Sequence, residues 1–256
     1  MKKCVILMAM LASASAAASD TYIRNGQIYS HEGQWVAEAG VGVTSKLYKG
    51  QDDTVFPVLN VGYHGEDFNA DVAGINYRFL GNTGDVFNMN AFIDSAGTGY
   101  DDKDAKVLKG MKDRDFSVDL GLNIDLSFGG GTFSTYLQHD VAGAYKGMVG
   151  GTRYAQVISL GALDFVPYAG VAWLSKDYVD YYFGVRKNEA TATRKAYKGD
   201  SSLSYEVGYK LVLPLSPNWE LTQSTNYVRL GKDVSDSPLV KSANQWVAGA
   251  TVAYHF

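Results

Sequence analysis

The sequence predicts an all-β protein, namely an antiparallel transmembrane β-barrel of about twelve strands, with ten as the alternative count, behind a cleaved signal peptide. Three observations support this fold class. Apolar and polar residues alternate over stretches longer than ordinary strands, aromatic residues stand at the ends of these stretches, and the chain ends on one of them. Alternation with a period of two places successive side chains on opposite faces of a strand.

Residues 1–18 are predicted to be the signal peptide and residues 19–256 the barrel, in one domain. Lys2 and Lys3 precede an apolar run, and a stretch of Ala and Ser follows it; this order is typical of a secretory signal. The apolar run is too short for a membrane-spanning helix, which needs about 20 residues. Cys4 lies before most of the run, so we expect no lipid anchor. Cleavage of the signal peptide removes this one cysteine and leaves none for disulfide or thiolate chemistry.

The balance of charge excludes one class of partner. The whole chain carries a formal net charge of −4, and loss of the two signal-peptide lysines makes the remaining chain more acidic. Binding of nucleic acid relies on a basic patch, and the sequence contains no basic cluster. No apolar run reaches the length of a transmembrane helix, so a helical membrane protein is excluded as well.

The clearest strand is predicted at 116–128. Its apolar residues fall on one parity, from Phe116 to Phe128, and the other parity holds Ser, Asp, Gly and Asn. This stretch exceeds the roughly 5–6 residues of globular strands and suits a tilted membrane crossing, which needs about 9–11. In 68–79 the parity shifts near Gly74, where we expect a β-bulge. The other predicted strands are 35–46, 54–63, 68–79, 86–95, 131–141, 146–159, 164–174, 203–213, 219–228 and 245–256.

Alternation alone fits either a soluble sandwich or a membrane barrel, and strand length and aromatic placement favour the barrel. Aromatic girdles mark the two membrane interfaces of such barrels. A sheet edge in lipid would leave a row of unpaired backbone groups, so the sheet must close. Tyr254 and Phe256 at the end of the last strand are the predicted membrane-assembly signal. The aromatic residues at strand ends are Trp35, Phe116, Phe128, Trp173, Trp219 and Tyr254.

In a barrel the polar parity faces the lumen, which identifies candidate lumen-facing residues. This interior is either a narrow water-filled pore or a plugged, hydrogen-bonded core. Barrels of about 10–12 strands lie between the filled and the open types, and of the two interiors we favour the plugged core. Glu206 and Lys210 are too far apart along one strand to pair with each other, so each needs another partner. The candidates are Asp119, Asn123, Asp125, Glu206 and Lys210.

The strand count does not close from the pattern alone. Counting back from the C-terminus places long polar loops outside and short turns in the periplasm, but puts 64–67 outside and 47–53 in the periplasm. An even count then requires either that 21–30 is an extra strand, giving twelve, or that one early segment does not cross, giving ten. We favour twelve. Segment 179–185 could cross instead of lying in the external loop 175–201.

Several segments, taken in their order along the chain, carry a family signature. They are 35–42, 48–53, 99–104 with 108–111, 180–185, 229–232 with 236–240, and 252–256. With them the mature chain resembles the MipA/OmpV family of outer-membrane proteins, and it is closer to the OmpV branch. The resemblance implies a barrel in the outer membrane of a Gram-negative bacterium, without known catalytic residues. It implies cell-wall scaffolding for the MipA branch, and osmotic response, adhesion and immunogenicity for the OmpV branch.

The predicted function is therefore a structural, scaffolding or surface-interaction role in the cell envelope, and the alternative is a small-solute diffusion channel. We expect no enzymatic activity and no cofactor. The expected partners are outer-membrane lipids and lipopolysaccharide, the barrel-assembly machinery, and either periplasmic cell-wall enzymes or host surface proteins. Nucleic acid is not expected to bind.

Four groups of residues could carry chemistry or contacts. The acidic loop with Asp101, Asp102 and Asp104 could bind a divalent cation, but interleaved lysines favour a solvated external loop. The aromatic triplet Tyr181, Tyr182 and Phe183 could contact a partner, belong to an interfacial belt, or fold over the barrel mouth. A hydrolase built on Ser134, His139 and Asp140 is disfavoured, because adjacent strand residues point to opposite faces. The histidines at 31, 64, 139 and 255 share no metal-binding spacing.

Overall fold

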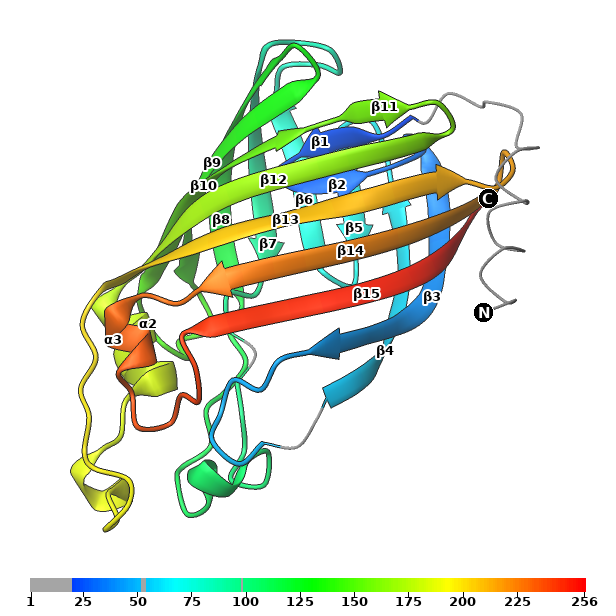
Figure 1. Cartoon of the computed structure of the whole chain (residues 1–256). Coiled ribbons are helices and arrows are strands. Elements are labelled where there is room, and N and C mark those ends of the chain that lie inside the picture. Colours follow the sequence, from blue (N-terminus) through cyan, green and yellow to red (C-terminus); the bar gives the residue numbers. More distant parts are fainter. Residues whose placement is uncertain (1–19, 52–53, 98) are drawn as a thin grey trace, which may run out of the picture.

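The computed structural model describes residues 20–51, 54–97 and 99–256. The predicted signal peptide at 1–18 lies outside these residues and remains a prediction. Over the described part of the chain, none of the helices has the length and apolar character needed to cross a membrane. The structure consists mainly of strands, with short helices in the loops at one end (Figure 1).

Twelve antiparallel strands close into a barrel, which confirms the predicted fold class. Strands that follow one another in the chain pair with each other, and the pairing of β15 with β3 joins the two ends of the series. The additional short strand β11 (Ile158–Leu160) continues β10 alongside β12. The barrel strands are β3 (Gln34–Thr44), β4 (Thr54–His64), β5 (Phe68–Asp71), β6 (Gly74–Leu80), β7 (Phe87–Asp94), β8 (Asp119–Phe128), β9 (Gly131–Asp140), β10 (Met148–Gln156), β12 (Leu163–Leu174), β13 (Ser202–Pro214), β14 (Trp219–Arg229) and β15 (Asn244–His255).

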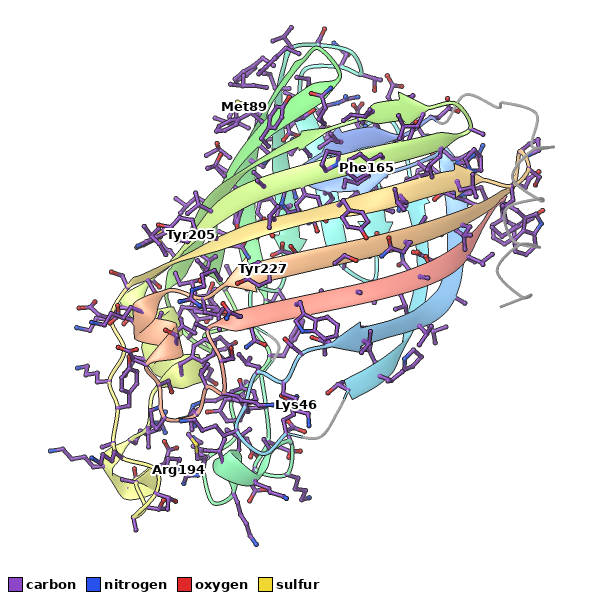
Figure 2. The ribbon with its side chains drawn as sticks, viewed as in Figure 1. Lys46, Met89, Phe165, Arg194, Tyr205 and Tyr227 are labelled. Carbon is purple, nitrogen blue, oxygen red and sulfur yellow. The ribbon has the colours of Figure 1, made fainter. Side chains whose placement is uncertain are left out.

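The barrel wall is apolar on the outside and polar on the inside, the reverse of a globular protein. On β8, Leu120 and Leu122 are more than half exposed, whereas Asn123 keeps 1% of its surface accessible. Tyr205 and Tyr227 likewise lie on the outward faces of β13 and β14 (Figure 2). An outward apolar face is stable in hydrocarbon and would be unstable in water, so the alternation reflects the surrounding lipid.

The predicted number of twelve strands is right, but two expectations behind it are wrong. Segment 68–79 is a hairpin of β5 and β6 rather than one strand with a bulge at Gly74. The Asp71 carboxylate accepts hydrogen bonds from the backbone N–H of Ala73 (2.7 Å) and Gly74 (3.3 Å), which stabilises the turn. The register irregularity of β6 lies between Arg78 and Leu80. Segment 21–30 adds no strand to the wall.

The extra reversal at the β5–β6 turn corrects the topology of the first third. Residues 65–67 join the end of the barrel that carries the short turns, called here the turn end, where the chain also ends. Residues 45–51 join the opposite end, called the loop end, which carries the loops 95–118, 141–147, 175–201 and 230–243. The predicted sides of 64–67 and 47–53 were therefore wrong, and 179–185 belongs mostly to the helix α2 (Lys176–Phe183), which does not cross.

The wall is weakest beside β4. Among the described residues, β4 pairs with β5 only at Tyr63–Ala70 and His64–Asn69. Between the β5–β6 turn and the loop end, the stretch of β4 from Val55 to Leu59 has no partner strand on the side that faces β5. Val55 and Leu59 are each 69% exposed. Pro57, which has no backbone N–H, stands in this stretch. Proline is tolerated in sheets at such edges because no ladder bond is lost there.

The corrected topology predicts which residues reach the cell surface. We expect an impermeable thiol reagent to label Lys195→Cys on intact cells, because Lys195 is an exposed residue of the long loop 175–201. We expect Glu66→Cys to be labelled only after the outer membrane is permeabilised. The measurement is gel mobility after labelling, and surface labelling of Glu66→Cys would contradict the topology.

Candidate functional site in the lumen and the cap

A two-stranded hairpin of β1 (Tyr22–Arg24) and β2 (Gln27–Tyr29) lies inside the barrel (Figure 1). Its turn is Asn25-Gly26, with φ of 51° and 67°. Two consecutive positive φ angles define the turn that best fits the twist of paired strands, and Asn-Gly is its strongest sequence signal. This dipeptide between two short alternating segments was the signal that sequence analysis missed.

The hairpin is held by polar side chains of the barrel wall. The backbone N–H of Asn25 donates to the Asp125 carboxylate at 2.8 Å. Arg153 donates to the carbonyl oxygen of Gly26 at 2.8 Å, and the Lys210 ammonium donates to that of Ile28 at 3.3 Å. Two of the sequence-predicted lumen residues, Asp125 and Lys210, are thus brought onto the same segment.

Arg24 fixes the hairpin at the turn end. Its guanidinium donates to the carbonyl oxygen of Gly65 at 2.9 Å and to the side-chain oxygen of Asn69 at 3.0 Å. It also forms an ion pair with Glu32 at 2.8 Å. Arg24 is 4% exposed, so these partners replace water around a buried charge.

The remaining predicted lumen residues form bonds across the interior. Glu206 accepts two hydrogen bonds from Arg153, at 2.7 and 2.9 Å, which supplies the partner that its own strand lacks. Asn90 donates to Asn123 at 2.9 Å and to Asp125 at 3.0 Å. Bidentate arginine–carboxylate pairs are among the stronger polar contacts in proteins, so Glu206 holds the Arg153 side chain in position against the hairpin.

The hairpin borders several cavities of the lumen, and the largest, of about 570 Å³, lies at the turn end beside Tyr22 and Arg24. Two others lie on either side of Gln27. One of about 280 Å³ is lined by Gly26, Gln27 and Arg153 together with residues near the loop end. The other, of about 260 Å³, is lined by Gln27, Arg153, Lys210 and residues of β14 and β15. Gln27 and Arg153 line both cavities, so the hairpin and its arginine partner occupy the space between them.

The loops at the loop end form a compact structure, called here the cap. It contains α2, the short helix α3 (Lys232–Ser235) and the 3₁₀ turns η1 (Lys106–Leu108) and η2 (Lys187–Glu189). Two hydrophobic clusters hold it together. The first cluster comprises Tyr145, Val149, Val179, Tyr182, Phe183, Val234 and Val240. The second comprises Tyr100, Ala105, Leu108, Met111, Val185 and Leu239.

The aromatic triplet on α2 packs into the cap. Tyr182 and Phe183 are buried in the first cluster. The Tyr181 hydroxyl accepts a hydrogen bond from the backbone N–H of Asp115 at 2.9 Å. Asp119, another predicted lumen residue, accepts hydrogen bonds from Ser117 at 2.6 Å and from the Tyr145 hydroxyl. It therefore joins the wall to the cap.

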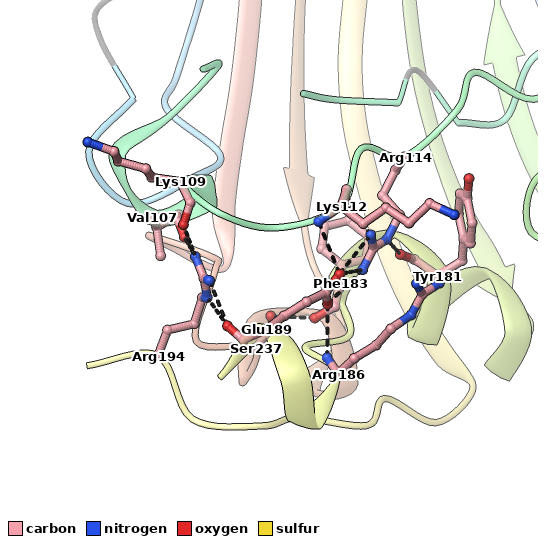
Figure 3. Close-up of polar contacts among 10 residues, drawn as sticks. All are labelled: Val107, Lys109, Lys112, Arg114, Tyr181, Phe183, Arg186, Glu189, Arg194 and Ser237. Carbon is pink, nitrogen blue, oxygen red and sulfur yellow. Dashed lines mark hydrogen bonds and ion pairs between the residues drawn. The ribbon is translucent and has the colours of Figure 1, made fainter. Parts of the chain in front are cut away.

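A buried ion pair connects two loops of the cap (Figure 3). The Arg114 guanidinium contacts the Glu189 carboxylate at 3.0 Å, and their side chains are 1% and 4% exposed. Arg194 donates to the carbonyl oxygens of Glu189 and Val107. Burial by itself would raise the pKa of the Glu189 carboxyl, but the hydrogen bonds from Arg114 and from backbone N–H groups outweigh it and hold this pKa below its ordinary value.

The cap contains an open pocket of about 760 Å³. Lysines and an arginine line it together with aspartates of loop 95–118 and of α2. Tyr145, Tyr181 and Tyr197 also line it. Charges of both signs beside tyrosine rings suit a polar ligand or a polar segment of another macromolecule.

Other sequence candidates lie apart from these features. Asp101 and Asp104 are exposed, and their carboxylates accept hydrogen bonds from backbone N–H groups of their own loop; Asp102 is half-buried. The Tyr254 ring packs on the Trp219 ring at 4.9 Å, and Phe256 is 70% exposed at the turn end.

The hydrolase candidates do not form a triad. Ser134 donates to Asp125 at 2.5 Å, inside the lumen. His139 bonds the carbonyl oxygen of Gly147 at 2.7 Å. The Asp140 carboxylate accepts hydrogen bonds from backbone N–H groups of the loop 141–147, including that of Tyr145 at 2.7 Å.

Residues 38–256 match the family model described as MltA-interacting protein MipA. The chain belongs to this family. It is 53% identical to outer membrane protein Omp26La of Vibrio anguillarum and 52% identical to outer membrane protein OmpV of Vibrio cholerae serotype O1, in both cases over 100% of each chain. It is 26% identical to the MltA-interacting protein of Escherichia coli K12, over 88% of this chain and 91% of the relative.

These similarities confirm the resemblance found in the sequence, including its closer relation to OmpV than to MipA. With the barrel, they also confirm the predicted outer-membrane location. This member of the MipA family is an outer-membrane β-barrel protein whose lumen contains its own N-terminal hairpin.

We expect Glu189→Gln to loosen the cap without unfolding the barrel. The substitution leaves the buried Arg114 charge without its counterion, and breaking one partner of a buried pair costs about 3–5 kcal/mol. The measurement is hydrogen–deuterium exchange of residues 175–201 in the detergent-purified protein. Glu66→Gln, an exposed substitution at the turn end, is the control and should leave exchange unchanged. Equal protection in Glu189→Gln and wild type would contradict a stabilising role of the pair.

The same pair makes cap stability depend on pH. Because the pKa of Glu189 is lower in the folded cap than in the unfolded loop, its contribution is fully present above the unfolded value, about 4.3, and is lost as pH falls through the folded value. We expect protection of 175–201, corrected for intrinsic exchange, to be constant from neutral pH to about 5 and to fall below about 4. Glu189→Gln should lack this acid-dependent loss relative to its own value at neutral pH.

Proposed function

We propose that this protein is a plugged structural barrel that presents its cap at the cell surface for interactions with host surface molecules. The observation that carries the proposal is the position of the β1–β2 hairpin, which is bonded inside the lumen to Asp125, Arg153 and Lys210. A lumen that contains a bonded hairpin supports a role in which the external surface binds partners, rather than one in which solutes pass through a permanently open pore.

The cap supports an interaction role because its loops are already ordered. Two hydrophobic clusters and the buried Arg114–Glu189 pair fix the loops relative to one another. Ordered loops lose less conformational entropy on binding than loose ones, so they bind partners with a smaller entropic penalty. The pocket of about 760 Å³ lies between these loops and offers charged and aromatic side chains to a partner.

A role without catalysis fits the placement of the polar residues. Ser134, His139 and Asp140 each bond a different partner, and the curated relatives are named as outer membrane proteins.

A scaffold for periplasmic cell-wall enzymes is less well supported. The relative from E. coli is named as interacting with MltA, and such a contact would use the turn end of this barrel. The connections there are short, for example 129–130 and 161–162, and offer less surface than the cap.

A binding assay with paired charge variants tests the surface role. Bacteria that express the wild-type protein should adhere to immobilised epithelial membrane proteins more strongly than cells lacking it. Lys187→Ala with Lys198→Ala, at exposed positions lining the pocket, should reduce adhesion several-fold. Lys109→Ala with Lys241→Ala, exposed residues outside the pocket, is the matched control with the same change of charge. Adhesion equal to that of cells lacking the protein would contradict the proposal.

A gated diffusion channel is the second candidate, and the cavities of the lumen favour it. The hairpin separates cavities of about 280 and 260 Å³, and its hydrogen bonds to the lumen wall come from a few polar groups. Displacement of so short a segment would join them into a wider interior.

Planar-bilayer recording separates the two functions. The wild-type protein should give no steady conductance steps, whereas a variant lacking residues 20–33 should give them, because its lumen is no longer divided. Steady conductance of the wild-type protein would contradict the plugged barrel. Absence of conductance in the deletion variant, with the barrel folded by circular dichroism, would remove the channel.

A further inference from the structure

A cluster of three ligand-type side chains lies where the N-terminal segment meets the last two strands. His31 follows β2, Glu220 is the second residue of β14, and His255 is the last residue of β15. One ligand atom from each lies within 4.8 Å of the others. The histidines share no spacing in the sequence, and only barrel closure and entry of the hairpin bring them together.

The cluster is buried and its polar atoms lack ordinary partners. The side chains of Glu220 and His255 are each 2% exposed, and that of His31 is 13% exposed. His31 Nδ1, Glu220 Oε2 and both ring nitrogens of His255 have no hydrogen-bond partner. Buried polar atoms without partners are rare in native proteins, and an ion or water is a common explanation.

Direct hydrogen bonding within the cluster does not satisfy these atoms. Glu220 Oε2 lies 3.5 Å from His31 Nδ1 and 3.8 Å from His255 Nε2, beyond the usual range of about 2.7–3.2 Å. The two imidazole rings are stacked with centroids 4.0 Å apart. Because an imidazole binds a metal ion in the plane of its ring, one ring must turn before both rings can point at the same ion.

We propose that His31, Glu220 and His255 form a Zn²⁺ site that fastens the N-terminal segment to the C-terminal strands of the barrel. Two imidazoles and one carboxylate are a familiar zinc ligand set with a fourth position for water. Nitrogen ligands favour zinc over calcium or magnesium, which prefer oxygen alone. Tetrahedral zinc places its ligand atoms about 3.3 Å apart. The ligand atoms of the cluster lie up to 4.8 Å apart, so they must approach one another by roughly 1.5 Å.

A cavity beside two of the three ligands leaves room for a water ligand. Glu220 and His255 line a cavity of about 150 Å³ together with His64, Asp71 and Lys210. The Lys210 ammonium in this cavity donates to the carbonyl oxygen of Ile28, so one of its hydrogen bonds is directed to the hairpin. His31 is in the connection between β2 and β3, and rotation of its side chain does not disturb a ladder of the wall.

Zinc stoichiometry of the chelator-stripped, detergent-purified protein tests the site. After incubation with ZnCl₂ and dialysis, the wild-type protein should retain one equivalent by mass spectrometry, and Co²⁺ should give the strong visible absorption of a tetrahedral site. His31→Asn and Glu220→Gln should lower zinc affinity at least about tenfold, since even loss of groups that only support ligands has effects of this size. Asn tolerates the positive φ of 57° at residue 31.

Two histidine variants are the controls. His64→Gln alters the same cavity outside the cluster, and His139→Gln alters a histidine bonded to Gly147 at the loop end; both should retain zinc. Equal zinc retention by the wild type, His31→Asn and Glu220→Gln would overturn the site.

The fastening of the N-terminal segment has a separate readout. Zinc should slow hydrogen–deuterium exchange of residues 27–33 in the wild type and not in His31→Asn. Zinc binding that leaves this exchange unchanged would overturn the fastening role. Neither result depends on the adhesion assay, so the failure of the proposed surface role and the failure of this site can be told apart.

Discussion

Charged groups enclosed by the barrel must find partners inside it, and the rest of the structure depends on this constraint. Hydrocarbon outside the wall forces the polar parity of every strand inward. Asp125, Arg153 and Lys210 then face an interior of limited volume, where an unpaired charge is costly. The backbone of the β1–β2 hairpin supplies donors and acceptors to all three. The hairpin therefore not only fills the lumen but also satisfies the charged side chains that line it.

The same requirement acts at the loop end in a different form. Asp119 is the first residue of β8, at the loop end. Its carboxylate accepts hydrogen bonds from Ser117 and from the hydroxyl of Tyr145, a member of the first cap cluster. The Arg114–Glu189 pair repeats this logic farther out, where both charges are buried among loops. Polar bonding therefore runs from the interior of the wall into the cap, where hydrophobic clusters surround it.

The turn end differs because its polar atoms are less completely satisfied. Arg24 has three partners there, whereas His31, Glu220 and His255 leave several atoms without hydrogen bonds. Pairing of β15 with β3 closes the barrel, and His255 at the end of β15 lies beside His31 of the N-terminal segment. Coupling the two ends of the chain at this position would link closure of the wall to placement of the hairpin.

The sequence by itself determined the all-β class, the membrane barrel and most strand positions, because a period-2 pattern such as 116–128 reports directly which face meets lipid. It also predicted polar residues that face the lumen, among them Asn123 and Asp125, and both are buried in the structure. It did not distinguish a bulge from a turn near Gly74, since both interrupt the parity, and this misplaced the first third of the chain. The Asn25-Gly26 turn was readable, but its location in the lumen was not. Only the tertiary structure decided which distant residues meet, for example His31 with His255 and Arg114 with Glu189, because closure of the barrel and folding of the loops set those distances.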